Sequence, residues 1–377
     1  MSRKRMLYRY EFQTVKWFLM AGLFLCGLVL LAMNSVFSSE NWGWVSYGSG
    51  TQFFFSGDFL GFGGVLVQAL QVCTLPAILF LGGMTAYQFS DSHKRNKREF
   101  ISSLPYTQQE RFLAKVLVGI GTITMLCLVF GIGVFVMRAC HYLIMIRSSL
   151  VYPEYKLLMA NDTWFHTLRT LALLWFIMLA AYALYVLVNS LVIHGIAAAL
   201  VGVGTMLAPS WIAYQICGYV EYLNAEMLFS PNQWLLNHPT ICRMCRLFRG
   251  GGYCREHFGV GLEQYGDTVE GINFTLIDYC SSGKVIALTI ALALACFALA
   301  WFVNIRQDGA RFGRVVPLKW VRKILSAGMA VCFGTGFSWI FIYILRLENA
   351  AMVCSVCAVV CIGLFLLIDK ILRRAVR

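Results

Sequence analysis

Charge is what this chain has least of. Only 13% of its 377 residues are charged, against about 25% in a typical soluble domain. In contrast, 59% of the residues are hydrophobic, and the mean hydropathy is +0.70. So few polar side chains cannot cover the surface of such a chain in water. The composition therefore excludes an ordinary soluble protein and predicts a protein whose solvent is the lipid bilayer.

Catalytic and nucleotide-binding motifs are also missing from the sequence. A Walker A loop, G-x-x-x-x-G-K-[ST], cradles phosphates with its backbone and lysine. The nearest stretch, DYCSSGKV, has Asp278 at the first glycine position and Val285 at the hydroxyl position. There is no H-E-x-x-H, no G-x-S-x-G and no recognisable pair of carboxylates. We therefore predict that this chain is not an enzyme, cannot hydrolyse ATP and holds no cofactor of its own.

Long apolar runs are what the chain does contain. A run of about 20 apolar residues crosses a bilayer as a helix, because a helix satisfies its backbone polar groups internally. The sequence predicts an all-α, polytopic bundle of about eight transmembrane helices. Because only Asn189 and Ser190 separate the fourth and fifth runs, we expect a bent hairpin there. The runs are 15–37, 64–87, 116–137, 171–188, 191–214, 285–303, 324–345 and 351–368.

The first run follows several basic residues, as a signal peptide would. Its apolar core is longer than the 7–15 residues usual for a signal, and no A-x-A cleavage site follows. We therefore expect a retained first span. Residues 1–17 then form a basic interfacial helix with Trp17 at the membrane boundary. The alternative is positive flanking residues without a separate helix.

The net charge of +13 is distributed unevenly along the chain. Most of the 31 Lys and Arg residues fall between alternate apolar runs, which is the positive-inside pattern. This pattern predicts that both termini are cytoplasmic and that 138–169 and 215–284 are extracytoplasmic. Basic residues divided in this way do not indicate a nucleic-acid partner. The basic segments are 1–16, 88–115, 304–323 and 370–377.

The cytoplasmic segment 88–115 carries a structured pattern, KRNKREFISSLPYTQQERFLAK over its residues 94–115. Asp91 or Ser92 can cap a short basic helix that stops before Pro105, because the residue before proline disfavours helix. Thr107 and Glu110 fit the S/T-x-x-E capping box and predict a second helix that enters the third span.

The same segment has an apolar face that a topology-setting loop does not need. Phe100, Ile101 and Leu104 supply this face. Buried aromatic and aliphatic anchors carry most of the energy of an interface. The pattern therefore predicts a docking surface for a cytosolic partner.

REFISSLPYTQQERFLAK resembles the segment between the second and third spans of bacterial ABC exporter permeases of the type-2 class. In that family this segment is the coupling helix, which sits in a cleft of the ATPase subunit. The resemblance implies a membrane-spanning permease subunit of an ATP-driven exporter in the bacterial plasma membrane. ATP and Mg would bind a separate ATPase subunit, which docks on 91–111, and a second permease subunit would complete the pathway. The implied docking residues are Glu99, Phe100, Ile101, Leu104, Pro105, Arg111 and Lys115.

VVPLKWVRKIL, after the sixth span, resembles the second cytoplasmic loop of a Gram-positive subgroup with extra C-terminal spans. This implies a six-span permease core at 1–304, followed by a cytoplasmic loop and two further spans at 305–377. Two other readings stay open: a membrane enzyme or accessory factor that uses 215–284, and a secondary transporter. Scarce charge within the spans argues against proton coupling. The sequence specifies neither the substrate nor a homodimer or heterodimer.

Gln68, Gln71 and Thr74 lie at three-residue spacing and so share a face of the second span. One interpretation is a polar stripe along a translocation path. The other is hydrogen bonding between helices, which contributes about 0.6–2 kcal/mol per contact.

The extracytoplasmic segment 215–284 contains a C-x-x-C pair followed by C-x-x-H. Four such ligands can bind zinc, although the eight-residue gap between the pairs is shorter than the usual 12–20. Disulfides or free thiols are the favoured interpretation, because extracytoplasmic cysteines commonly pair. For the cysteines within spans, such as Cys354, Cys357 and Cys361, we expect packing. The candidate disulfide or metal residues are Cys242, Cys245, Cys254, His257 and Cys280, with Cys217 as a further partner.

Overall fold

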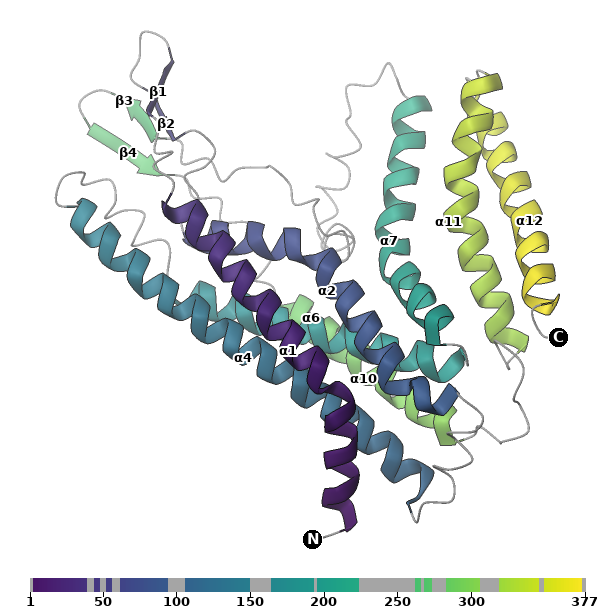
Figure 1. The fold of residues 1–377 in the computed structure, drawn as a ribbon. Coiled ribbons are helices and arrows are strands. Elements are labelled where there is room, and N and C mark those ends of the chain that lie inside the picture. The colour runs from purple at the N-terminus through teal and green to yellow at the C-terminus, as the bar shows by residue number, and fades with distance from the viewer. Residues whose placement is uncertain are drawn as a thin grey trace.

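A computed structural model shows eight α-helices and two β-hairpins in the residues it describes (Figure 1). The described residues are 3–38, 44–47, 52–55, 62–93, 106–149, 164–192, 195–223, 262–265, 268–272, 283–305, 319–345 and 349–374. The helices are α1 (Arg3–Ser38), α2 (Phe62–His93), α4 (Gln108–Ser149), α6 (Trp164–Leu191), α7 (Gly195–Leu223), α10 (Gly283–Ile305), α11 (Lys319–Leu345) and α12 (Ala350–Arg374).

Six of these helices contain stretches long and apolar enough to cross a membrane, and each stretch has 20 to 36 residues. The predicted polytopic helical bundle is therefore confirmed for the described residues, and the chain has the character of a multi-pass membrane protein. In addition, α7 contains the shorter apolar stretch Ala197–Ala208. The six stretches are Arg5–Asn34, Gln108–Leu143, Thr167–Leu191, Ile286–Ile305, Trp320–Ile342 and Ala351–Ile371.

The β-hairpins were not part of the predicted fold. Strand β1 (Trp44–Tyr47) pairs antiparallel with β2 (Gln52–Phe55), and β3 (Leu262–Tyr265) pairs antiparallel with β4 (Thr268–Ile272). Figure 1 shows the two hairpins together beyond the C-terminal end of α1. Aromatic and β-branched residues favour strands, so WVSY and QFFF were a signal that the long apolar runs obscured.

Two predicted boundaries between helices were misplaced. The division between the fourth and fifth runs exists but lies a few residues later, since α6 ends at Leu191 and α7 begins at Gly195. Asn189 and Ser190 do not interrupt α6, because Asn189 Nδ2 donates to the Tyr185 carbonyl at 2.9 Å and Ser190 Oγ to the Val186 carbonyl at 2.9 Å. Side chains that bond one turn back within their own helix can remain in it. Similarly, α2 continues to His93, so Asp91 and Ser92 belong to its last turn rather than to the start of a separate helix.

The start of the chain forms no separate interfacial helix. Instead, α1 is one helix from Arg3 to Ser38, with a length of about 54 Å at 1.5 Å per residue. Near its middle α2 contains Pro76, and Figure 1 shows this helix bent along its course. Proline removes a helical hydrogen bond and is the usual cause of such a bend.

The apolar core of the bundle has two main clusters, one toward each end. We name the ends after the buried cations of α4, the Lys115 end and the Arg138 end. The cluster at the Lys115 end joins α1, α2, α4, α6, α7 and α10, and includes Leu81, Tyr182 and Tyr185. The cluster at the Arg138 end joins α1, α2 and α4, and includes Phe62 and Val134.

Glycines allow the two large buried tyrosines of α6 to fit between helices. The Tyr182 ring lies so close to Gly119 of α4 that a Cβ there would overlap it. Tyr185 lies against Gly82 of α2 and Gly202 of α7, and its hydroxyl donates to the Ile78 carbonyl at 2.9 Å. These contacts bring α6 close to three other helices.

Helices α11 and α12 pack against each other and contact the rest of the bundle through α7 (Figure 1). Two hydrogen bonds between α7 and α11 use indoles: Trp211 Nε1 donates to the Cys332 carbonyl at 2.9 Å, and Trp339 Nε1 donates to Gln215 Oε1 at 2.6 Å. Arg322 of α11 and Asp369 of α12 form an ion pair at 3.0 Å.

The cysteines of α12 divide into two groups. Cys361 packs closely against Gly334 of α11, which confirms its predicted packing role, and Cys357 also contacts α11 through a hydrogen bond from its Sγ to the Ser338 hydroxyl at 3.1 Å. Cys354 is exposed and does not share that role.

Candidate functional site

The start of α4 is fixed by local sequence. The Thr107 amide donates to Glu110 Oε2 at 3.0 Å, and the Glu110 amide donates to Thr107 Oγ1 at 3.2 Å. This reciprocal pair is the predicted capping box, which is therefore confirmed. Because the helix begins at Gln108, Lys115 lies two turns inside it and among the other helices.

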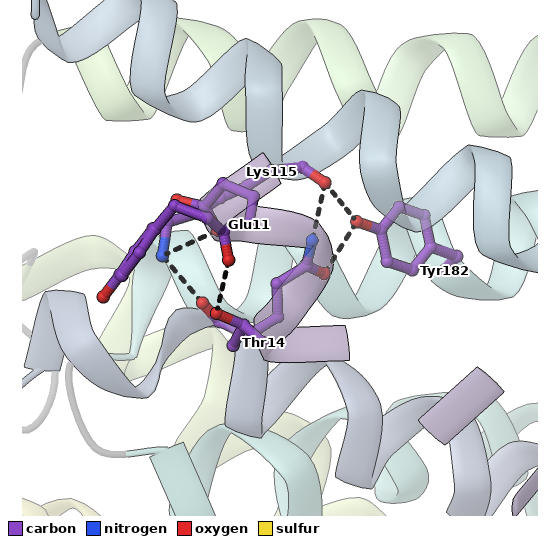
Figure 2. Close-up of polar contacts among 6 residues, drawn as sticks. Glu11, Thr14, Lys115 and Tyr182 are labelled. Atoms are coloured by element: carbon purple, nitrogen blue, oxygen red, sulfur yellow. Dashed lines mark hydrogen bonds and ion pairs between the residues drawn. The ribbon is translucent and has the colours of Figure 1, made fainter. Parts of the chain in front are cut away.

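Lys115 is a buried cation at the centre of the Lys115 end (Figure 2). Its Nζ donates to the Gln88 carbonyl of α2 at 2.7 Å and lies 3.9 Å from the carboxylate of Glu11 on α1. The ammonium also lies 5.4 Å from the centre of the Phe89 ring. A buried charge is costly unless it is paired and hydrogen-bonded, and these contacts supply both requirements.

The side chain of Gln88 in turn forms a hydrogen bond to the backbone of Lys115. Its Nε2 donates to the Lys115 carbonyl at 2.6 Å, while its Oε1 accepts a bond from the Tyr182 hydroxyl of α6 at 3.0 Å. Gln88 and Lys115 therefore each bond to the other's backbone, which locks the end of α2 to the start of α4. We call Glu11, Gln88, Lys115 and Tyr182 the Lys115 cluster.

Helix α10 is joined to the same end of α4. The Gln108 side-chain amide donates to the Asn304 carbonyl at 2.7 Å. One turn further, the Phe112 ring lies edge-on to Trp301 at 5.8 Å and to Phe89 at 6.3 Å. Helices α1, α2, α4, α6 and α10 therefore all meet around the first two turns of α4.

A second buried cation, Arg138, lies on the same helix at the Arg138 end. Its guanidinium carbon lies 5.5 Å from the centre of the Phe62 ring and 5.0 Å from that of Trp164. It also donates a hydrogen bond to the Thr167 hydroxyl. Trp164 in turn stacks on Phe135 with an interplanar angle of 5°. Here aromatic faces surround the cation.

Two of the predicted docking residues lie in the described part of the chain. Arg111 is half-buried in the first turn of α4, and Lys115 is buried in the Lys115 cluster. Because Lys115 contacts α1 and α2, we expect any effect on docking to act through the positions of these helices. Glu99, Phe100, Ile101, Leu104 and Pro105 lie outside the described residues, and their docking role stays a prediction.

The other predicted sites also stay predictions. Gln68, Gln71 and Thr74 belong to α2, but their side chains are outside the described part of the structure, as is that of Cys217 in α7. Cys242, Cys245, Cys254, His257 and Cys280 lie outside the described residues altogether.

Sequence reasoning missed Glu11, Gln88, Tyr182 and Arg138. Glu11 had a usable signal, because it is the only acidic residue before Glu40 and lies four residues before the apolar Val15. Gln88 and Lys115 flank the predicted docking segment, which was also a signal. Arg138 directly follows the third predicted run and looked like an ordinary flanking charge.

Comparison of this chain with models of known protein families, with curated proteins and with solved structures finds no match.

Proposed function

We propose that this chain is the membrane-spanning permease subunit of an ATP-driven exporter, and that segment 91–111 docks a separate ATPase subunit. The observation that carries the proposal is the connection between α2 and α4. The S-L-P segment joins two helix ends that Gln88 and Lys115 lock together through reciprocal backbone contacts. A force applied to this segment would move α2 and α4 as a unit.

The Lys115 cluster would pass such a movement to the rest of the bundle. Tyr182 contacts both Gln88 and the Lys115 carbonyl, at 3.0 and 3.4 Å, and so links α6 to the locked pair. Glu11 links α1 in the same way at 3.9 Å. Closely packed elements shift together rather than deform continuously, so this end is suited to transmit a displacement.

The same proposal includes the orientation of the chain in the membrane and its assembly with other subunits. The Lys115 end faces the cytosol of a bacterium, with both termini inside, because the basic segments collect there. Two permease subunits, identical or related, form the pathway, and two ATPases bind from the cytosol with ATP and Mg.

The test is copurification of an ABC ATPase with tagged variants of the full chain. Leu104→Arg puts a charge into the proposed apolar contact, and Phe100→Ala removes an aromatic anchor. Lys94→Arg is the matched control, because it keeps the charge of the same segment. We expect the first two variants to reach the membrane normally but to copurify with at most one tenth of the ATPase bound by the unchanged chain, because removing an interface anchor weakens binding by about this factor or more.

The control should retain the ATPase and transport. If Leu104→Arg copurifies with the ATPase as well as the unchanged chain does, segment 91–111 is not the docking surface. If no ABC ATPase copurifies with the unchanged chain either, the exporter proposal itself fails.

A further inference from the structure

The first turns of α1 have one face packed on the bundle. Leu7, Glu11 and Val15 follow each other at four-residue spacing, and all three are buried, with 8%, 3% and 1% of their surfaces exposed. Residues four apart lie on the same side of a helix. This face therefore fixes the rotation of α1 about its axis, with Glu11 turned toward Lys115 (Figure 2).

The opposite face of these turns is basic. Arg5, Arg9 and Lys16 are all exposed, and spacings of four and seven residues place them on one side of the helix. Because the other face is packed, the three cations are held in a fixed direction away from the bundle.

The composition of the exposed surface changes along α1. Trp17 is 70% exposed, and its ring lies 5.5 Å from Lys16 Nζ. Beyond it, Met20 and Phe24 are 62% and 67% exposed. Met6, Tyr10 and Phe12 are exposed among the basic residues, whereas from Trp17 to Ala32 the exposed surface of α1 is apolar without further charge. Charges that end at an aromatic residue are typical of the passage from lipid headgroups into the hydrocarbon core.

The length of the helix places the cations at headgroup depth. The apolar stretch Arg5–Asn34 has 30 residues and so measures about 45 Å. The hydrocarbon core is only about 30 Å thick, and about 40–45 Å with the headgroup regions. About ten residues therefore lie beyond the hydrocarbon. If these are the first ten, Arg5 and Arg9 lie among the headgroups, and Lys16 lies just inside the boundary, from which its long side chain can reach the headgroups.

We propose that the basic face of α1, formed by Arg5, Arg9 and Lys16, is a binding site for the headgroups of anionic phospholipids. Two arginines at headgroup depth, with Lys16 reaching toward the same side, match the negative phosphates of such lipids. The apolar residues that follow match their acyl chains. The proposal needs no ATPase and is independent of the exporter proposal.

The test is native mass spectrometry of the full chain in detergent, titrated with phosphatidylglycerol or with phosphatidylcholine of the same acyl chains. We expect a preference for phosphatidylglycerol that falls at least about tenfold in R5Q/R9Q/K16Q, since each cation at an anionic surface contributes about fivefold. The matched control is R147Q/K323Q/K370Q, which removes three exposed charges elsewhere and should keep the preference.

Two further arms complete the design. In the unchanged chain, raising the salt from about 0.1 to 0.5 M should reduce the preference, because salt screens exposed charges. Water-soluble glycerol phosphate in excess should not displace the lipid, since it lacks acyl chains. The proposed lipid site would be overturned if R5Q/R9Q/K16Q kept the full preference, or if the control lost it equally. It would also be overturned if salt had no effect or if glycerol phosphate displaced the lipid.

Discussion

Lys115 and Arg138 are two buried cations on one helix, about 35 Å apart along its axis, and the bundle accommodates them differently. Lys115 has a carboxylate and a backbone carbonyl as its neighbours, at 3.9 and 2.7 Å. Arg138 lies between two aromatic rings and bonds to a threonine hydroxyl. The two environments follow from the chemistry of the two cations.

An ammonium is a compact, strongly hydrated charge, whereas a guanidinium is planar, delocalised and more weakly hydrated. The first needs a full negative charge or strong acceptors when water is removed. The second can stack on π faces, which attract it through the ring quadrupole. The comparison teaches that the Lys115 end is held by an ion pair and hydrogen bonds, and the Arg138 end by contacts of a delocalised cation with aromatic rings.

The largest expected effect is at the Lys115 end. Glu11→Ala removes the carboxylate beside a buried ammonium, and we expect the free energy of unfolding to fall by about 3 kcal/mol. The measurement is unfolding of the purified chain in mixed detergent and SDS micelles. The double variant Glu11→Ala, Lys115→Met removes both charges and should recover most of this loss. If the double variant is less stable than Glu11→Ala, the unpaired charge of Lys115 is not the cause of the stability lost in Glu11→Ala.

A smaller effect is expected at the Arg138 end. Arg138→Lys keeps the charge but loses the delocalised guanidinium that lies over the Phe62 and Trp164 rings, and should lower the free energy of unfolding by about 1–2 kcal/mol. Arg138→Met keeps an extended apolar side chain between the rings and should be less destabilising than Arg138→Lys in the same unfolding titration. The reverse order would mean that any cation near the rings suffices and that the delocalised guanidinium has no special role.

The smallest of the three effects concerns a neutral member of the Lys115 cluster. Tyr182→Phe removes the hydroxyl that bonds to Gln88 but keeps the ring against Gly119, so we expect a loss of about 1 kcal/mol. Tyr142→Phe is the matched control, because Tyr142 is 40% exposed and should change the free energy of unfolding by less than about 0.5 kcal/mol. Equal effects in the two variants would exclude a special role for the buried hydroxyl.

Local sequence patterns predicted the helices and helix starts that are stabilised by interactions between residues close together in the chain. The apolar runs gave the helices of the bundle, and Thr107 with Glu110 gave the start of α4. Where a local rule failed, another local bond replaced the expected one, as at Asn189 and Ser190 inside α6. Docking by 91–111, the polar stripe of α2 and the extracytoplasmic cysteines stay predictions.

Composition and order of residues determined by themselves that this chain is a polytopic helical membrane protein, because the apolar runs and the capping box act within one segment. Only the tertiary structure decided that Lys115 is buried. Its neighbours Glu11, Gln88 and Tyr182 come from three other helices. The environment of a buried charge is set by the helices that pack around it. The spacing of residues within one helix shows which of them share a face, but it does not specify which other helices pack against that face.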